Sequence, residues 1–314
     1  MMENKDMIVN CSFYDNKYSC GHETIHNCIA NMSPIPVTAA EVYFLANVIR
    51  FEMFDNDISV GYNGLNTIFQ GIKTNITRAV RLKYVDDEEC ALEDIKENLM
   101  KNRLIILYLK AEGLYYHSIS QKRYPYHMVI CYGYNEVTGD LFIADLCVND
   151  DNKVSSLQLE ADYESIIRNT KEYLIFEENN DKSISFCRES IVSVVKNELA
   201  LYLKHQHKII INYLNQLPNT EHEYQANSII AFKWVIIIPL LCSLRDFIQE
   251  RNICLTNVEK LNNLIANWET EIYRVIKNVY KRRNTYENID IEDLDIRTHQ
   301  IINLIMEKLD YGSY

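Results

Sequence analysis

The sequence is poor in the two residues that punctuate turn-rich chains. It has only 8 glycines and 5 prolines among 314 residues, which excludes a collagen-like or low-complexity chain and argues against an all-β sandwich built on many tight turns. Positive charge is scarce as well, because 32 lysines and arginines face 44 aspartates and glutamates and the net charge is −12. A general nucleic-acid-binding surface is therefore not expected, and an acidic partner would need a local basic patch.

The chain also lacks a long hydrophobic run. The longest extends from Trp234 to Leu244, includes Pro239 and is flanked by Lys233 and Arg245, so it is too short to span a bilayer and predicts a buried helix. The first residues are charged, so no secretory signal peptide is expected. The nine cysteines are scattered, odd in number and without a Cys-x-x-Cys pair, which indicates reduced thiols in a cytoplasmic protein.

What the sequence does contain is the balance of a globular protein, with 47% hydrophobic and 24% charged residues. At roughly 150 residues per domain, the length predicts two domains. Short helical and strand-like segments alternate up to about residue 180, and only long helical patterns follow, at roughly 186–216, 226–250, 255–282 and 290–310. We therefore predict an α+β fold, with a catalytic-type domain over residues 1–180 and a helical bundle or lid over residues 181–314.

Several patterned segments frame the first domain. A helix is predicted from Cys20 to Met32, and Thr38 and Glu41 have the spacing of a capping box at the start of a second helix. Apolar runs at 127–134 and 141–146 flank a polar loop with a glycine and predict a β-hairpin. The other predicted elements are strands over 78–85, 104–109 and 172–176 and helices over 87–102 and 155–168.

Cys20 is the strongest candidate for chemistry. It lies in the segment Tyr18-Ser19-Cys20-Gly21 at the predicted start of a helix, where the positive end of the helix dipole favours a thiolate. The small Gly21 would let a substrate approach closely. By itself, a cysteine at a helix start is weak evidence for catalysis, and a structural role is the more common one.

His127 and Asp145 are predicted to lie at the same end of the sheet. His127 opens the first hairpin strand and Asp145 closes the second, and these ends are adjacent in an antiparallel pair. Each could be structural alone, but an imidazole that is oriented by a carboxylate and faces a thiol is the arrangement that nucleophilic catalysis needs. Together with Cys20 they predict a catalytic triad. His22 ranks second as the base, because a side chain two residues further along the same helix normally points away from Cys20.

These segments resemble the papain-like, peptidase C39-like cysteine fold and, more narrowly, the butirosin biosynthesis protein H-like family. The similarity lies in Tyr18 to Gly21, Tyr126 to Tyr134, Leu141 to Asp145 and Val154 to Leu159, and it covers roughly residues 8–180. It implies a domain in which a helix bearing the cysteine packs on an antiparallel sheet, followed by an all-α region.

The resemblance also implies an enzyme, an acyltransferase that forms amide bonds in antibiotic or other thiotemplated (nonribosomal) peptide biosynthesis, including pathways of the closthioamide type. An acyl or peptidyl group would move from the phosphopantetheine thioester of a carrier protein onto a small amine. Carried over by position, Cys20 is the nucleophile, His127 the base and then the acid, and Asp145 the orienting residue. No metal or cofactor is implied beyond the phosphopantetheine of the partner.

The chain departs from the family pattern on the oxyanion side. Papain-like enzymes commonly place a glutamine about six residues before the cysteine, whereas Tyr14 stands there in this sequence and Asn16 is the nearest amide side chain. The backbone N–H of Cys20 with Asn16 or Tyr14 is the expected oxyanion site. A glycine-rich segment expected after the second helix is replaced by residues 48–54.

A basic cluster is the expected docking patch for an acidic carrier protein. Its members are Lys73, Arg78, Arg81 and Lys83. The alternative is a solvated strand edge with alternating polar residues.

Two other functions stay open. The same triad would serve a cysteine peptidase or amidase, which would need an open cleft for a peptide. A non-catalytic binding module with the same fold would tolerate the loss of Cys20. For the C-terminal helices, an apolar face either pairs two subunits in a homodimer or covers the active site.

Overall fold

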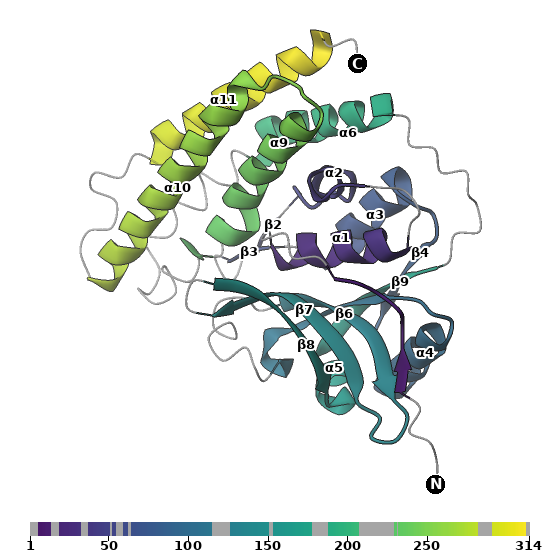
Figure 1. Cartoon of the computed structure of the whole chain (residues 1–314). Helices are drawn as coiled ribbons and strands as arrows, with labels where there is room; N and C mark the ends of the chain where they lie inside the picture. The colour runs from purple at the N-terminus through teal and green to yellow at the C-terminus, as the bar shows by residue number, and fades with distance from the viewer. Residues whose placement is uncertain are drawn as a thin grey trace. The chain divides into compact units, whose positions relative to one another are not determined.

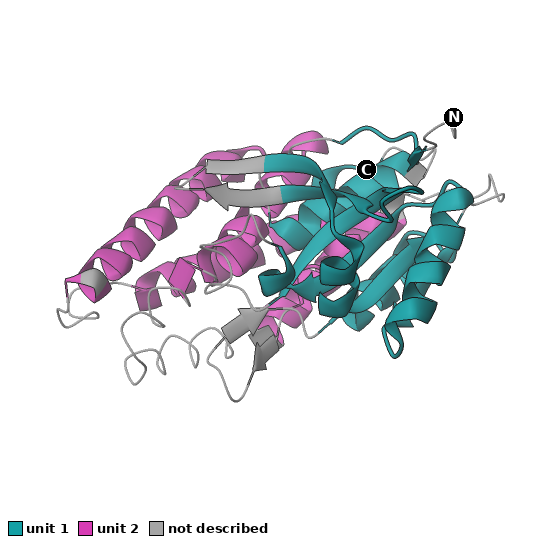
Figure 2. Ribbon diagram, turned by 90° about the horizontal axis from the view of Figure 1, so that it is seen from below, with its two compact units in different colours: residues 1–42, 64–185 teal, residues 43–63, 186–314 magenta. Residues whose placement is uncertain are grey.

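The computed structural model describes residues 6–13, 19–32, 37–50, 52–54, 59–61, 64–114, 126–150, 153–177, 188–206, 229–230, 232–281 and 291–311 (Figure 1). The chain forms two compact units, coloured separately in Figure 2. Unit 1 comprises residues 1–42 and 64–185, and unit 2 comprises residues 43–63 and 186–314. Among the residues just given, no helix is long and apolar enough to cross a membrane.

Unit 1 is built on an antiparallel sheet in the order β4-β9-β5-β6-β7-β8, with β1 paired to the far end of β6. The central strand β5 is a nearly continuous aliphatic run whose first five residues are buried, as expected of a strand covered on both faces. The strands are β1 (Asp6–Ile8), β4 (Val80–Tyr84), β5 (Ile105–Lys110), β6 (Tyr126–Asn135), β7 (Leu141–Asp150), β8 (Lys153–Ala161) and β9 (Thr170–Phe176).

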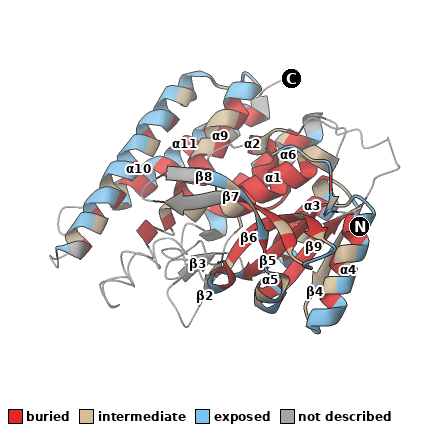
Figure 3. Cartoon of the chain, turned by 60° about the horizontal axis from the view of Figure 1, so that its bottom comes forward, coloured by how far each residue is buried: buried red, intermediate tan, exposed pale blue. Residues whose placement is uncertain are grey.

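Helix α1 (Cys20–Met32) packs on β5, β6 and β7. Its residues from Gly21 to Ile29 are all buried, and the helix is almost entirely red in Figure 3. Within the helix, the hydroxyl of Thr24 donates to the carbonyl oxygen of Met128 at 3.3 Å. This bond ties the first turn after Cys20 to the strand residue that follows His127.

The remaining helices of unit 1 are α2 (Ala39–Leu45, whose last three residues belong to unit 2), α3 (Asn66–Asn75), α4 (Glu88–Met100) and α5 (Tyr163–Asn169), with a 3-10 turn η1 (Ala111–Gly113). The predicted capping box is confirmed, because the Thr38 N–H donates to Glu41 Oε2 and the Glu41 N–H donates to Thr38 Oγ1, both at 3.2 Å. Asp87 caps α4 by accepting the Cys90 N–H at 2.8 Å.

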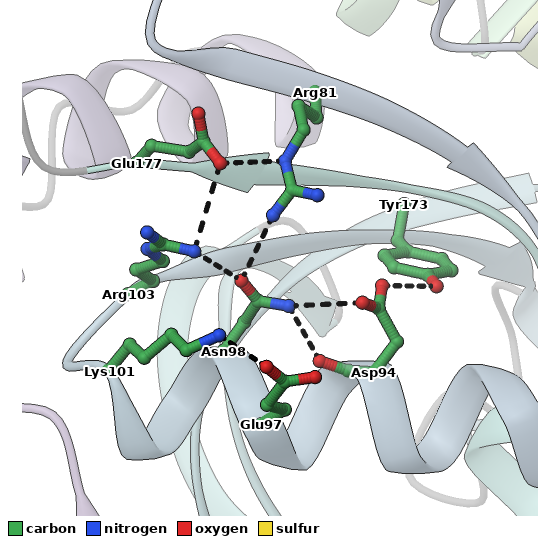
Figure 4. A network of polar contacts seen from close by, with 8 residues as sticks. All are labelled: Arg81, Asp94, Glu97, Asn98, Lys101, Arg103, Tyr173 and Glu177. Atoms are coloured by element: carbon green, nitrogen blue, oxygen red, sulfur yellow. Dashed lines mark hydrogen bonds and ion pairs between the residues drawn. The ribbon is translucent and has the colours of Figure 1, made fainter.

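A polar network joins α4 to the sheet (Figure 4). Asn98 is buried on α4, and its Oδ1 accepts from Arg103 at 2.8 Å and from Arg81 at 3.3 Å. One turn earlier, Asp94 accepts the hydroxyl of Tyr173 at 2.8 Å. The side chains of Asn98 and Asp94 therefore bond to residues on the strands or directly before them. These bonds fix α4 against β4, β5 and β9.

One predicted helix is wrong. Residues 155–168 form the end of β8 and then the short helix α5. The side chains of this segment have the two-residue period of a strand and not the period of a helix, because Leu157, Leu159 and Ala161 alternate with exposed polar residues. Likewise, β7 continues to Asp150, so Asp145 lies inside the strand and not at its end. The register between β7 and β8 shifts just after it.

Unit 2 contains the C-terminal helices and a two-stranded ribbon, β2 (Glu52–Phe54) with β3 (Ser59–Gly61), that the sequence did not predict. The helices are α6 (Arg188–Leu201) with a π-helical extension η3 (Tyr202–Gln206), α9 (Ile238–Glu250) preceded by the π-helical η5 (Lys233–Ile237), α10 (Thr256–Tyr280) and α11 (Ile291–Tyr311). The predicted buried helix around Pro239 is confirmed, with the proline as the second residue of α9, directly after the π-helical η5.

The core of unit 2 is centred on Trp268, which is fully buried. Its ring packs against Phe232, and its indole N–H donates to Thr298 on α11 at 3.0 Å. Arg50 forms a two-pronged ion pair with Glu198 of α6, at 2.6 and 2.8 Å. The α+β class with a helical C-terminal region is thus confirmed.

Candidate active site

Cys20 is the first residue of α1 and is partly exposed. The turn that presents it is held by Ser19, whose carbonyl accepts the Glu23 N–H at 3.0 Å and whose hydroxyl lies 3.4 Å from the His22 nitrogen. A serine just before the helix satisfies N–H groups that would otherwise lack partners in the first turn. The sulfur is therefore carried by a capped, buried helix and not by a loop.

His127 and Asp145 form a buried pair on neighbouring strands. The Nε2 atom of His127 lies 2.9 Å from Oδ1 and 2.9 Å from Oδ2 of Asp145. The histidine is 5% exposed and the aspartate is not exposed at all, so the interaction is screened little by solvent. The carboxylate holds the ring through Nε2, which leaves Nδ1 as the nitrogen that can face another group.

Cys20 is that other group. A hydrogen bond and an electrostatic interaction link it to His127. Burial, the largest single influence, lowers the pKa of His127, but Asp145 and Cys20 together outweigh it and hold that pKa well above its usual value. The structure therefore brings Cys20, His127 and Asp145 together and favours the imidazolium form of the histidine.

The surroundings of the other thiols differ. Burial raises the pKa of Cys11 to about 11, of Cys242 to about 11 and of Cys131 to about 12. The exposed Cys90 also has a raised pKa, because it bonds to the Asp87 carboxylate. These thiols stay protonated at neutral pH and are expected to react slowly.

His22, the second candidate for the base, is fully buried and its Nε2 bonds to the Ala39 carbonyl at 2.5 Å. His26, one turn later, bonds to the backbone of Val37. Both histidines hold the segment that leads into α2. This observation favours a structural role for His22.

The two residues expected to complete the oxyanion site, Asn16 and Tyr14, lie outside the described residues. A buried polar group is also present within the sheet of unit 1. Tyr108 on β5, Glu172 on β9 and the backbone at Gly64 form a buried cluster. The sequence analysis missed it, although a glutamate inside an otherwise apolar strand is a signal of a buried, paired charge.

The four basic residues of the expected docking patch are spread over α3, β4 and the segment between them. Lys73 is at the end of α3, with its ammonium 5.2 Å from the Phe69 ring centroid, Arg78 is exposed between α3 and β4, and Arg81 and Lys83 lie on β4. Arg81 is already paired with Glu177, with Nε and Oε1 2.7 Å apart (Figure 4). Arg78 is thus the better probe of docking.

Within the described parts of the chain, no three His, Cys, Asp or Glu side chains cluster in a way that could hold a metal ion. Comparison with known proteins gives one family. The family model described as Butirosin biosynthesis protein H, N-terminal, matches residues 19–146. No curated protein matches the chain. The matched segment begins one residue before Cys20 and ends one residue after Asp145.

Proposed function

Because residues 19–146 match the family model of the butirosin biosynthesis protein H N-terminal domain, we propose that the chain is a cysteine-dependent acyltransferase acting in antibiotic or related peptide biosynthesis. Unit 1 would be a papain-like domain. Its reaction would move an acyl or peptidyl group from a carrier-protein thioester to an amine. The observation that carries the proposal is the buried His127–Asp145 pair bonded to a cysteine at the start of a helix.

Cys20, His127 and Asp145 have different roles in the proposed reaction. The Cys20 sulfur attacks the thioester carbonyl, and the imidazolium of His127 gives its proton to the departing pantetheine thiolate. The amine then attacks the Cys20 acyl-enzyme and passes a proton to the neutral imidazole, so the amide leaves and the starting state returns. Asp145 stabilises the imidazolium in both halves. A thioester is already activated, so the enzyme's main task is to position the amine and exclude water.

The test uses the acetyl thioester of N-acetylcysteamine as donor and a simple diamine as acceptor. Wild-type protein is expected to gain one acetyl group on Cys20, seen by peptide mass spectrometry, and to form the amide faster than the free acid. Cys20→Ala should reduce both products to background, and Cys90→Ala, which removes an exposed thiol, should change neither.

Each other outcome points to a different function. Rapid release of the acid, unaffected by the amine, would indicate a hydrolase such as a peptidase or amidase. An absence of acyl-enzyme in the wild type would contradict the proposal and favour a binding module. If transfer occurs, the Arg78→Glu variant tests docking. Slower transfer from a carrier-bound donor, with an unchanged rate for the free thioester, supports docking at Arg78. An equal effect of the variant on both donors, or no effect on either, rules it out.

A further inference from the structure

Thr24 lies one turn along α1 from Cys20, and its hydroxyl bonds outside the helix. Residues four apart share one face of a helix, so Thr24 and Cys20 are neighbours on the surface of α1. Thr270 and Thr298, which also lie within helices, each donate to the carbonyl oxygen four residues earlier, at 2.8 Å. For Thr24 that carbonyl belongs to Cys20, but the Thr24 hydroxyl donates instead to the carbonyl oxygen of Met128 on β6, at 3.3 Å.

This hydrogen bond reaches the backbone directly beside His127. Met128 follows His127 on β6, and the acceptor is a main-chain oxygen, so the bond holds the strand itself and not a side chain that could rotate. Thr24 is not exposed at all, and Met128 is only 1% exposed. Because water reaches neither residue, it cannot replace the bond. A hydroxyl has one proton to donate, and Thr24 uses it to join α1 to β6.

The start of β6 depends on such a bond, because strand pairing holds it on one side. His127 and Met128 pair with β5, whereas the described register of β6 with β7 begins at Ile130. On β7, the register with β8 shifts directly after Asp145. The histidine and its carboxylate partner therefore lie beyond the paired part of their two strands. Helix α1 packs on both of these strands, so a bond from α1 can fix the position of the histidine.

We propose that Thr24 is a positioning residue, whose bond to Met128 sets the separation between the Cys20 sulfur and the histidine that activates it. This inference rests on the proposed function. One helix carries Cys20 and Thr24, and one strand carries the bonding partners of both. The Thr24 bond holds helix and strand at the spacing at which the sulfur reaches the imidazole, and a proton can pass between them only at that spacing. No bond within Thr24 forms or breaks in the reaction.

The experiment follows acylation of Cys20 by the N-acetylcysteamine thioester in a single turnover without amine. It records the rate at saturating thioester, the half-saturating concentration and the final yield of acyl-enzyme. Thr24→Val keeps the branched shape of the side chain but removes the hydroxyl. It is expected to lower the saturated rate by roughly 10–100-fold, the cost of a displacement of up to about 1 Å. The half-saturating concentration and the yield should stay unchanged.

Two further variants at this position separate positioning from stability. Thr24→Ser retains the hydroxyl and should restore the saturated rate, and Thr24→Ala serves as a second hydroxyl-free variant if Thr24→Val fails to fold. A loss of stability alone would lower the yield and not the rate, because only folded protein reacts.

Ser165→Ala is the matched control. Ser165 on α5 also donates its hydroxyl to a backbone carbonyl outside its helix, that of Gly113, at 3.3 Å, and its loss should leave the saturated rate unchanged. If the variants that lack the Thr24 hydroxyl acylate at the wild-type saturated rate, or if Thr24→Ser is as slow as they are, the inference is overturned while the proposed function stands. If the wild type itself forms no acyl-enzyme, the proposed function has failed and the inference with it.

Discussion

At the scale of single residues, the proposed chemistry depends on a histidine whose surroundings have opposing effects on its pKa. Burial disfavours the charge on His127, whereas Asp145 and Cys20 favour it and prevail. A pKa raised above the unfolded value of about 6.5 means that protonation stabilises the folded state. That stabilisation is fully present below the unfolded pKa and is lost as the pH rises through the folded pKa.

Replacing Asp145 tests this balance. Asp145→Asn keeps the shape of the side chain but removes the charge that raises the pKa of His127. We expect the alkaline limb of the transfer rate to move to lower pH and the rate at its optimum to fall by roughly 10²–10⁴-fold. The difference in Tm between wild type and variant should narrow as the pH rises through the folded pKa of His127.

The control for this variant is Asp94→Asn, which alters a carboxylate bonded to Tyr173 and Asn98 and not to His127. Its pH profile should match that of the wild type. An unchanged profile in Asp145→Asn would show that the carboxylate does not govern the histidine.

At the same scale, single residues could be chosen from the sequence where chemistry and local position agreed. Cys20, His127 and Asp145 were selected because a thiol at a helix start and two polar residues on a hairpin fit one reaction, and the structure places them together. The buried position of Tyr108 beside Glu172 could not be predicted. Its position depends on the β5–β6 and β5–β9 registers and on the backbone at Gly64, which are separated in sequence.

At the scale of elements, the helices and strands that depend on interactions between residues close in sequence were mostly predicted. The capping box at Thr38, the cap at Asp87 and the apolar run of β5 act within a few residues, so α2, α4 and β5 were predicted near their true positions. The short ribbon β2–β3 depends on the pairing of its two strands and was not predicted. The segment around residue 155 was predicted as a helix although its side chains alternate with the two-residue period of a strand, which pairs with β7.

Gly64 offers a prediction at this scale. Both Gly64 and Gly139 have a φ of +82°, but a Cβ atom at Gly139 meets only the Tyr163 ring at 3.3 Å, whereas at Gly64 it meets the buried Glu172 carboxylate at 2.5 Å. Gly139→Ala should lower the free energy of unfolding by about 1 kcal/mol, from backbone strain alone. Gly64→Ala should lower it by about 2–4 kcal/mol, because the clash is added to the strain.

Thermal unfolding of the two variants by calorimetry measures the difference. Both variants have the same strain from a positive φ, so the additional loss of unfolding free energy in Gly64→Ala measures the clash with Glu172, the residue that orients the start of α3. Equal losses in the two variants would mean that Glu172 moves aside easily and does not fix this backbone.

At the scale of the whole molecule, composition and period were enough to predict an α+β unit and a helical C-terminal region. They did not indicate that residues 43–63 join the helices in unit 2, because that association depends on distant contacts such as Arg50 with Glu198. The thiols show the same dependence on tertiary structure. Burial, which depends on the whole fold, raises the pKa of Cys11, Cys131 and Cys242, whereas the raised pKa of Cys90 comes from Asp87, three residues before it.

The most direct measurement of the central claim is therefore the alkylation rate of every cysteine by mass spectrometry, from pH 5 to 9, in wild type and in His127→Ala, with Asp145→Asn as a second variant in case the first fails to fold. We predict that Cys20 reacts fastest in the wild type well below pH 8, ahead of the more exposed Cys90, and loses this advantage without His127. If Cys20 reacts no faster than Cys90, or if its rate is the same without His127, then His127 does not activate it and the account is wrong.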